Sequence, residues 1–160
     1  MKVENKISIL VADDHAIVRR GLVSLLSLHP EMNVVGEAEN GRSAVEQAMK
    51  IEPDVVLMDI GMPELNGLEA TRQIKKYVPA TKILVLSGYD NDEYIREIMR
   101  SGANGYLLKS TALEGLIDAI IAVSKGHNFF GPLLSDHGTG KLWTRSDSSS
   151  SSRTEGIEEK

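Results

Sequence analysis

The sequence predicts an α/β fold: a doubly wound, five-stranded parallel sheet with helices on both faces. Apolar runs of strand length alternate five times with segments of helical period over about 127 residues. The strand runs are nearly continuous in apolar residues, as expected of a parallel sheet that is buried on both sides. The chain has 160 residues, 41% of them hydrophobic, which is enough for one domain with a complete core.

The first strand–helix unit has a clearer strand pattern in the sequence than the second. KISILVADD, at 6–14, is a clear strand run that ends in two aspartates. The spacing that predicts the following helix is carried by Val18, Leu22, Leu25, Leu26 and His29. MNVVGEAE, at 32–39, is a weaker strand run. Its helix is predicted from Ala44, Val45, Ala48 and Met49.

The remaining three units are better marked at their ends. DVVLMD, at 54–59, is a strand, and its helix is predicted from Gly67, Thr71, Ile74 and Val78, with an end near Pro79. KILVLSG, at 82–88, precedes a short helix that is predicted from Tyr94, Ile95, Ile98 and Met99 and that ends near Gly102. GYLLK, at 105–109, precedes a helix that is predicted from Leu113, Leu116, Ile117, Ile120 and Ile121 and that ends near Gly126.

The composition changes after this fifth unit. Residues 131–160 are rich in serine, glycine and charge and show little periodicity. We therefore expect one domain over 1–130, followed by a linker or disordered tail over 131–160. Leu142 and Trp143 are two adjacent large apolar residues in this segment.

Composition also excludes several classes of protein. The chain has no cysteine, which excludes a disulfide framework and a thiolate metal site. The formal net charge of −5 argues against nucleic-acid binding by this chain itself. No apolar stretch has the length of a membrane span, and the N-terminus lacks the apolar core of a signal peptide, so a cytoplasmic location is expected.

Charged and polar residues stand at the carboxyl ends of four predicted strands. The first strand ends at Asp13 and Asp14, the third at Asp59, the fourth at Ser87 and the fifth at Lys109. In an open α/β sheet, ligands bind at this edge, next to the point where the strand order reverses. A strand order of 2-1-3-4-5 would bring three aspartates into one pocket, flanked by a hydroxyl and an ammonium group.

Three crowded carboxylates repel one another, and a hard divalent cation relieves that repulsion. Mg²⁺ takes oxygen ligands, and the backbone carbonyl of Gly61 could add one because glycine has no side chain in the way. A carboxylate beside Mg²⁺, a lysine and a hydroxyl is suited to attack on a phosphoryl group. Asp59 is therefore predicted to be a nucleophile at the rim of a metal site.

Four segments together resemble the receiver domain of bacterial two-component response regulators: ILVADDH, VVLMDIGMPELNG, ILVLSGY and GANGYLLKS. The resemblance covers about residues 7–127. DDHAIVRRGL and GANGYLLKS are most similar to the NarL/FixJ (LuxR-type) subfamily. The resemblance implies a flavodoxin-like (βα)5 fold and a phospho-accepting switch that takes its phosphoryl group from a sensor histidine kinase.

The resemblance also implies a role for each site residue. Asp59 matches the phosphorylated aspartate, and Lys109 matches the lysine that bridges to the phosphate. Mg²⁺ would be held by Asp13, Asp14, Asp59 and the Gly61 carbonyl. Ser87 matches the hydroxyl that moves toward the phosphoryl group, and Tyr106 the aromatic residue that changes rotamer on activation.

The sequence departs from the family in two places. Ser110 stands where many receivers have a proline, so a cis peptide bond is not expected there. Members of the subfamily usually continue into a helix-turn-helix domain, which this sequence does not contain; a truncated chain or a stand-alone receiver is expected. DNA would be bound only through that missing domain. The other expected partners are the kinase and a second copy of the chain, with no membrane contact.

Several alternatives remain at this stage. Asp14 could cap the first helix. Tyr106 could be an ordinary strand tyrosine. The four histidines, at positions 15, 29, 127 and 137, lack metal-ligand spacing. A phosphatase of the haloacid-dehalogenase type also uses an aspartate nucleophile and Mg²⁺, but it carries an acid/base aspartate where this chain has Gly61. A flavodoxin-like cofactor binder would need a phosphate-binding loop in place of ADDHA at 12–16.

Overall fold

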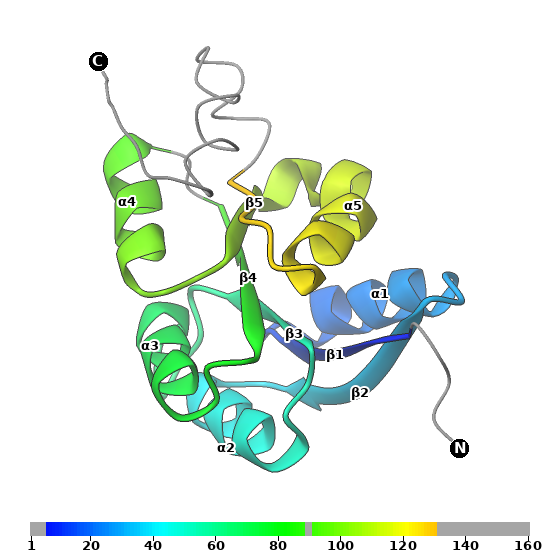
Figure 1. Ribbon diagram of the computed structural model, residues 1–160, viewed down its shortest axis with the longest axis horizontal. Coiled ribbons are helices and arrows are strands. Elements are labelled where there is room, and N and C mark those ends of the chain that lie inside the picture. Colours follow the sequence, from blue (N-terminus) through cyan, green and yellow to red (C-terminus); the bar gives the residue numbers. More distant parts are fainter. Residues whose placement is uncertain (1–5, 89–90, 131–160) are drawn as a thin grey trace.

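The computed structural model describes residues 6–88 and 91–130. Their strands form one parallel sheet in the order β2-β1-β3-β4-β5, which confirms the predicted fold class (Figure 1). The strands are β1 (Ile7–Ala12), β2 (Met32–Ala38), β3 (Val55–Asp59), β4 (Lys82–Ser87) and β5 (Gly105–Leu108). The predicted tail at 131–160, with Trp143 and the serine run, lies outside the described residues.

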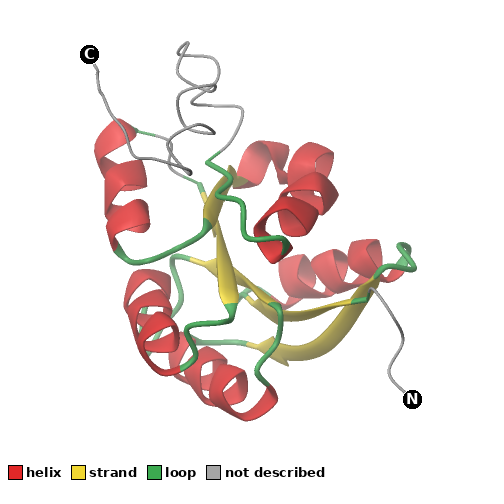
Figure 2. Ribbon diagram, in the orientation of Figure 1, coloured by secondary structure: helices red, strands yellow, loops and turns green. Residues whose placement is uncertain are grey.

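Helices cover both faces of the sheet (Figure 2). They are α1 (Ala16–Ser27), α2 (Gly41–Ile51), α3 (Gly67–Tyr77), α4 (Asp92–Arg100) and α5 (Ala112–Ser124), with a short 3₁₀ turn, η1 (Lys109–Thr111), before α5. The helices α2, α3 and α4 pack on one face, and α1 and α5 pack on the other. Among the described residues, no helix is both long enough and apolar enough to cross a bilayer.

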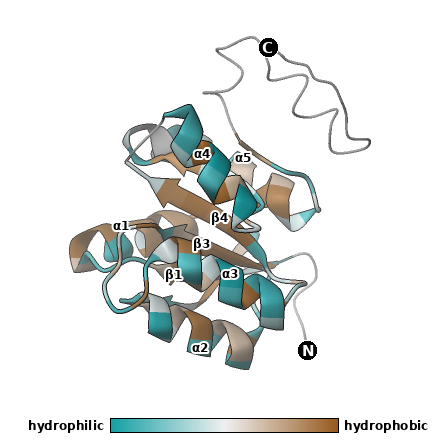
Figure 3. Ribbon diagram, turned by 90° about the vertical axis from the view of Figure 1, so that its left-hand side faces the viewer, coloured by the Kyte–Doolittle hydropathy of each residue, from teal (hydrophilic) through white to brown (hydrophobic). Residues whose placement is uncertain are grey.

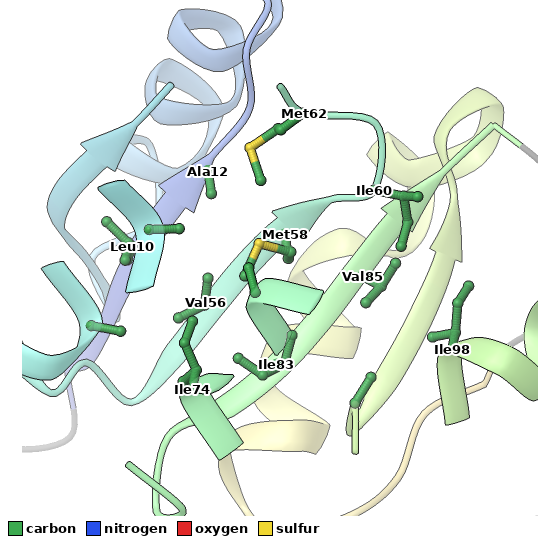
Figure 4. Close-up of a cluster of buried hydrophobic side chains, with 14 of the residues drawn as sticks. Leu10, Ala12, Val56, Met58, Ile60, Met62, Ile74, Ile83, Val85 and Ile98 are labelled. Carbon is green, nitrogen blue, oxygen red and sulfur yellow. The ribbon is translucent and has the colours of Figure 1, made fainter. Parts of the chain in front are cut away.

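Strand side chains alternate between two hydrophobic clusters because successive residues of a strand point to opposite faces. Leu10, Val56 and Ile83 belong to the cluster under α2, α3 and α4, part of which Figure 4 shows. Ile9 and Leu57 belong to the cluster under α1 and α5. All five residues of β3 are buried, so the strand that carries Asp59 lies at the centre of the molecule.

Asparagine caps begin three of the helices at the edge where the strands end. The side chain of Asn40 accepts a hydrogen bond from the backbone N–H of Ser43 at 2.7 Å. Asn66 and Asn91 cap α3 and α4 in the same way. Caps of this kind satisfy backbone donors that would otherwise have no partner and fix where each helix begins. The outer surfaces of α3 and α4 are largely hydrophilic, in contrast to the strands (Figure 3).

Three details of the predicted helices differ from the structure. Met49, one of the residues that predict the second helix, is 48% exposed and is not part of the buried face of α2. The first helix ends at Ser27, so His29 is not part of it. Val18 is 42% exposed, and the buried residues of α1 are Leu22 and Leu26. The first turn of α1 follows the loop at the sheet edge, where no core lies beneath it, and Ile17 is exposed there as well. The predicted ends near Gly102 and Gly126 are confirmed, since both have a left-handed φ, of 98° and 93°.

Candidate functional site

The predicted site residues converge at the carboxyl edge of the sheet. Asp13 directly follows β1, Asp59 and Ser87 are the last residues of β3 and β4, and Lys109 directly follows β5. The register aligns these strand ends side by side: Ala12 pairs with Met58, Asp59 with Leu86, and Ser87 with Leu108. The parallel sheet therefore brings together residues that lie almost one hundred positions apart in the sequence.

An ion pair links two of these residues. The Nζ of Lys109 lies 2.9 Å from Oδ1 of Asp59 and 3.9 Å from Oδ2 of Asp13. Asp59 is only 4% exposed. Burial, together with the charge of Asp13, raises its pKa above the ordinary value, although Lys109 and the backbone N–H of Gly61 act in the opposite direction. One lysine thus does not compensate the negative charge of this pocket.

The pKa of Lys109 reflects the same imbalance. Burial lowers it, but the hydrogen bond and charge of Asp59, with the charges of Asp13 and Asp14, raise it above its ordinary value. Lys109 is therefore firmly protonated. It is a fixed cation whose donors point at the carboxylates.

Hydrogen bonds to the backbone and to one carboxylate oxygen of Asp13 hold this residue in place. Its N–H donates to the carbonyl of Ala38 at 2.9 Å, and its carbonyl accepts from Nη1 of Arg19 at 2.7 Å. Its Oδ1 accepts from the N–H of His15 at 2.8 Å. Its Oδ2 is buried and has no hydrogen-bond donor. A buried carboxylate oxygen without a donor is costly unless a cation compensates it, so this atom is a natural metal ligand.

The acidic residues are close enough to share one metal ion. One ligand atom from each of Asp13, Asp14, His15 and Asp59 lies within 4.8 Å of the others. Carboxylate oxygens are the ligands that Mg²⁺ prefers, so the predicted residues fit that ion. The four histidines lack metal-ligand spacing in the sequence, yet the structure places a ring nitrogen of His15 in this acidic cluster. Its signal in the sequence was adjacency to the aspartates rather than a ligand spacing.

The alternative role of Asp14 as a helix cap is wrong. His15 is the N-cap residue of α1, and no side chain caps that helix. Asp14 is instead about one-quarter exposed, and its Oδ1 is buried without a hydrogen bond, facing His15 at 3.3 Å. Its carboxylate is thus available to a cation at the site.

The start of α3, which follows the loop after Asp59, packs closely on the backbone of Asp59. A Cβ at Gly67 would lie 2.3 Å from the carbonyl oxygen of Asp59, so only glycine allows α3 to begin there. A Cβ at Gly61 would meet no atom within 4 Å. Steric room for a Cβ therefore does not by itself require glycine at position 61, and the role of the Gly61 carbonyl as a metal ligand stays a prediction. Met62 and Ile60 anchor the loop in the core (Figure 4).

Ser87 and Tyr106 point to the face of the sheet that α2, α3 and α4 cover. Val85 pairs with Tyr106, and both belong to the cluster under α3 and α4. Ser87 lies two residues beyond Val85 and so has the same orientation. Tyr106 is already buried, with 1% of its surface exposed. The expected inward rotation of its ring on activation therefore cannot start from this arrangement, in which the ring is already inside.

Sequence reasoning did not find one supporting pair. Nε of Arg19 donates to Oε1 of Glu37 at 3.0 Å, and Arg20 contacts the other oxygen of Glu37. Arg19 thereby ties the end of β2 to the Asp13 carbonyl. Nothing in the sequence marks this arginine, because its role depends on where α1 crosses the strand ends.

Known proteins with a similar sequence include several that are named as regulatory proteins. A profile of the response regulator receiver domain matches residues 9–121. The transcriptional regulatory protein DegU of Brevibacillus brevis is 44% identical over 129 residues, which is 81% of this chain and 55% of the relative. The oxygen regulatory protein NreC of Staphylococcus carnosus is 42% identical over 127 residues, or 79% and 58%. The chain thus spans just over half the length of these relatives.

Solved structures of response regulators superimpose on this chain. A two-component response regulator of the LuxR family from Aurantimonas sp. SI85-9A1 superimposes with a TM-score of 0.78 at 30% identity, covering 86% of this chain and 99% of that one. The signal receiver domain of NarL from Mycobacterium tuberculosis gives 0.74 at 34% identity, covering 77% and 99%. The flavodoxin-like fold implied by the sequence resemblance is confirmed.

Proposed function

The chain belongs to the response regulator receiver domain family, and on that premise we propose that it is a phospho-accepting switch of a two-component system. In this proposal, a sensor histidine kinase in the cytoplasm donates a phosphoryl group to Asp59. The modified domain then controls a transcriptional output domain in a longer protein. The names of the relatives support this output, since they are called transcriptional regulators.

The acceptor role of Asp59 follows from its surroundings. A carboxylate oxygen attacks phosphorus, an O–P bond forms, and the P–N bond to the donor imidazole breaks with its electron pair leaving on nitrogen. Lys109, 2.9 Å from Oδ1 of Asp59, lies where it can donate to the oxygens of the transferred group. Positioning and charge compensation are most of what phosphoryl transfer requires. The raised pKa of Asp59 reflects a carboxylate poorly solvated by water, which favours nucleophilic attack.

Asp13, Asp14 and Asp59 are proposed to hold Mg²⁺, with the Gly61 carbonyl as a further ligand. The donor-free Oδ2 of Asp13 is the observation that favours a cation here. When bound, the ion supplies positive charge for the phosphoryl oxygens. The backbone contacts of Asp13 and the burial of Asp59 would hold two of the three carboxylates in place for the ion.

A hydrolase that turns over external substrates is less well supported. The haloacid-dehalogenase mechanism needs a carboxylic acid two residues after the nucleophile, and Gly61 has no side chain to provide it. We propose that catalysis is limited to the gain and loss of the domain's own phosphoryl group.

Ser87 and Tyr106 are proposed to carry the signal away from Asp59. Their shared face of the sheet lies under α3 and α4, so a movement of Ser87 toward a phosphoryl group would change the packing around Tyr106. Because Tyr106 is already buried, phosphorylation would stabilise this inward arrangement against an outward one. This is a two-state population shift, in which the phosphate favours one state.

The contact between Asp59 and Lys109, beside the donor-free oxygen of Asp13, is the observation that carries the proposal. Incubation with Mg²⁺ and a small phosphodonor should add about 80 Da to the intact protein, the mass of one HPO₃. Asp59→Asn should not gain this mass. Asp54→Asn is the matched control, because Asp54 stands at the opposite end of the same strand, where it accepts from the N–H of Ser8. A wild-type chain that gains no mass under these conditions would refute the proposal.

A further inference from the structure

His15 lies at the metal site with a ligand atom directed at both aspartates. Its Nδ1 is 3.4 Å from Oδ1 of Asp13 and 3.3 Å from Oδ1 of Asp14. Ligands about 2.1 Å from a metal ion stand about 3.0–3.4 Å apart in octahedral and tetrahedral sites. Nδ1 therefore already lies at the separation of a neighbouring ligand from one oxygen of each aspartate.

The second observation is independent of the histidine. Oδ2 of Asp13 and Oδ1 of Asp14 are buried atoms with no hydrogen-bond donor, although Asp13 itself is only 1% exposed. Lys109 does not meet this need, because it is 3.9 Å from Oδ2 of Asp13 and is hydrogen-bonded to Asp59. Both aspartates therefore keep a buried oxygen that can bind a cation.

We propose that Nδ1 of His15 is a nitrogen ligand of this site, beside Asp13 and Asp14, and that it shifts the preference of the site toward Co²⁺, Ni²⁺ and Zn²⁺. This inference rests on the metal half of the proposed function. Imidazole suits Co²⁺, Ni²⁺ and Zn²⁺, whereas Mg²⁺ and Mn²⁺ select oxygen ligands. His15 thus adds affinity for the first group and little for Mg²⁺. The occupancy of the acceptor pocket would then depend on which divalent ions are present.

Two features of the chain favour this role. The side chain of His15 is 67% exposed, so an ion can reach its ring from solvent without opening the core. The chain has no cysteine, so no thiolate competes for a soft ion. The simpler role of His15 is an ion pair with the aspartates when its ring is protonated. That role predicts no preference among divalent ions.

Isothermal titration calorimetry of the tag-free chain with Co²⁺ and, separately, with Mg²⁺ distinguishes the two roles. Oxygen-only sites also prefer Co²⁺, so the comparison is between variants. His15→Ala should lower Co²⁺ affinity about tenfold or more, the loss seen even for outer-shell partners of metal ligands. Its Mg²⁺ affinity should change much less. His15→Phe, which keeps a ring without nitrogen, should behave in the same way.

His29→Ala is the matched control, since His29 follows the far end of α1 and takes no part in the acidic cluster. It should leave both affinities unchanged. Equal Co²⁺ affinities of wild type and His15→Ala would overturn the inference while leaving the magnesium site intact. Equal losses for Co²⁺ and Mg²⁺ would also overturn it, because His15 would then act through the loop. A wild-type chain that binds neither ion would refute the metal half of the proposed function as well.

Discussion

Replacement of Asp59 by asparagine is expected to stabilise the metal-free protein at neutral pH. The amide has nearly the same shape, so the packing of this buried residue is kept. Its oxygen can still accept a hydrogen bond from Lys109. What changes is the charge, which is poorly compensated in this pocket, as the raised pKa of Asp59 indicates.

The size of this stabilisation depends on three energies: the attraction between Asp59 and Lys109, the repulsion between Asp59 and Asp13, and the cost of burying the charge. At an effective dielectric constant of about 20, the 2.9 Å contact with Lys109 contributes about 6 kcal/mol of attraction, and Asp13, within 4.8 Å, opposes it by about 3.5 kcal/mol. Burial of a carboxylate costs several kcal/mol, which exceeds the remaining attraction of about 2 kcal/mol. Removal of the charge should therefore increase the free energy of unfolding by about 1–3 kcal/mol.

The raised pKa of Asp59 also fixes how the stability of the wild type changes with pH. The native pKa of Asp59 lies above its ordinary value of 3.8, so in the range between the two the native state binds more protons than the unfolded state. The stability of the wild type then falls as pH rises through this range. The advantage of Asp59→Asn should be full at neutral pH and should disappear in acid below the ordinary value.

Urea unfolding followed by far-ultraviolet circular dichroism, with EDTA present, measures this advantage. Wild type, Asp59→Asn and the control Asp54→Asn should be compared at neutral pH and in mild acid. Equal slopes of the urea dependence would show that the comparison concerns stability alone. If Asp59→Asn is less stable than the wild type at neutral pH, the Lys109 contact outweighs the crowding, and our account of the electrostatics is wrong.

Three further predictions concern the metal, the loop and the switch. Millimolar Mg²⁺ should raise the melting temperature of the wild type by binding only the native state, and Asp14→Ala should remove most of that shift; a shift of the same size in the variant would exclude Asp14 as a ligand. Gly67→Ala should lower the free energy of unfolding by about 1–3 kcal/mol because its Cβ would overlap the backbone at the end of β3, whereas Gly61→Ala should be neutral in the same urea assay. Ser87→Ala should still be phosphorylated, but the NMR signals of the Tyr106 ring should respond less to beryllofluoride than in the wild type; an unchanged response would separate Ser87 from the switch.

The fold was predictable because its signals are local and repeated. The apolar runs that end at Ala12, Asp59 and Ser87 all became central strands, and the strand order places their ends together. Once that order is assumed, Asp13, Asp59 and Lys109 must meet, since parallel strands bring their carboxyl ends to one edge. This part of the site needed no knowledge of side-chain packing.

What the sequence did not predict depends on contacts made in three dimensions. Arg19 supports Asp13 only because α1 crosses the strand ends at one particular place. His15 lies beside the aspartates because of the turn of the loop, which no ligand spacing encodes. Val18 has the helical spacing of a core residue but lies beyond the sheet edge, so periodicity could not reveal its exposure. The burial of Tyr106 likewise depends on how α4 packs on the sheet.

The acceptor role of Asp59 is tested most directly by locating the phosphoryl group. The phosphorylated chain can be reduced with borohydride, which converts an aspartyl phosphate to homoserine, and then digested and sequenced by tandem mass spectrometry. We expect homoserine at position 59, with Asp13, Asp14 and Asp54 unmodified. Homoserine at another position, with unmodified aspartate at 59, would contradict the assignment of the acceptor and the mechanism derived from it.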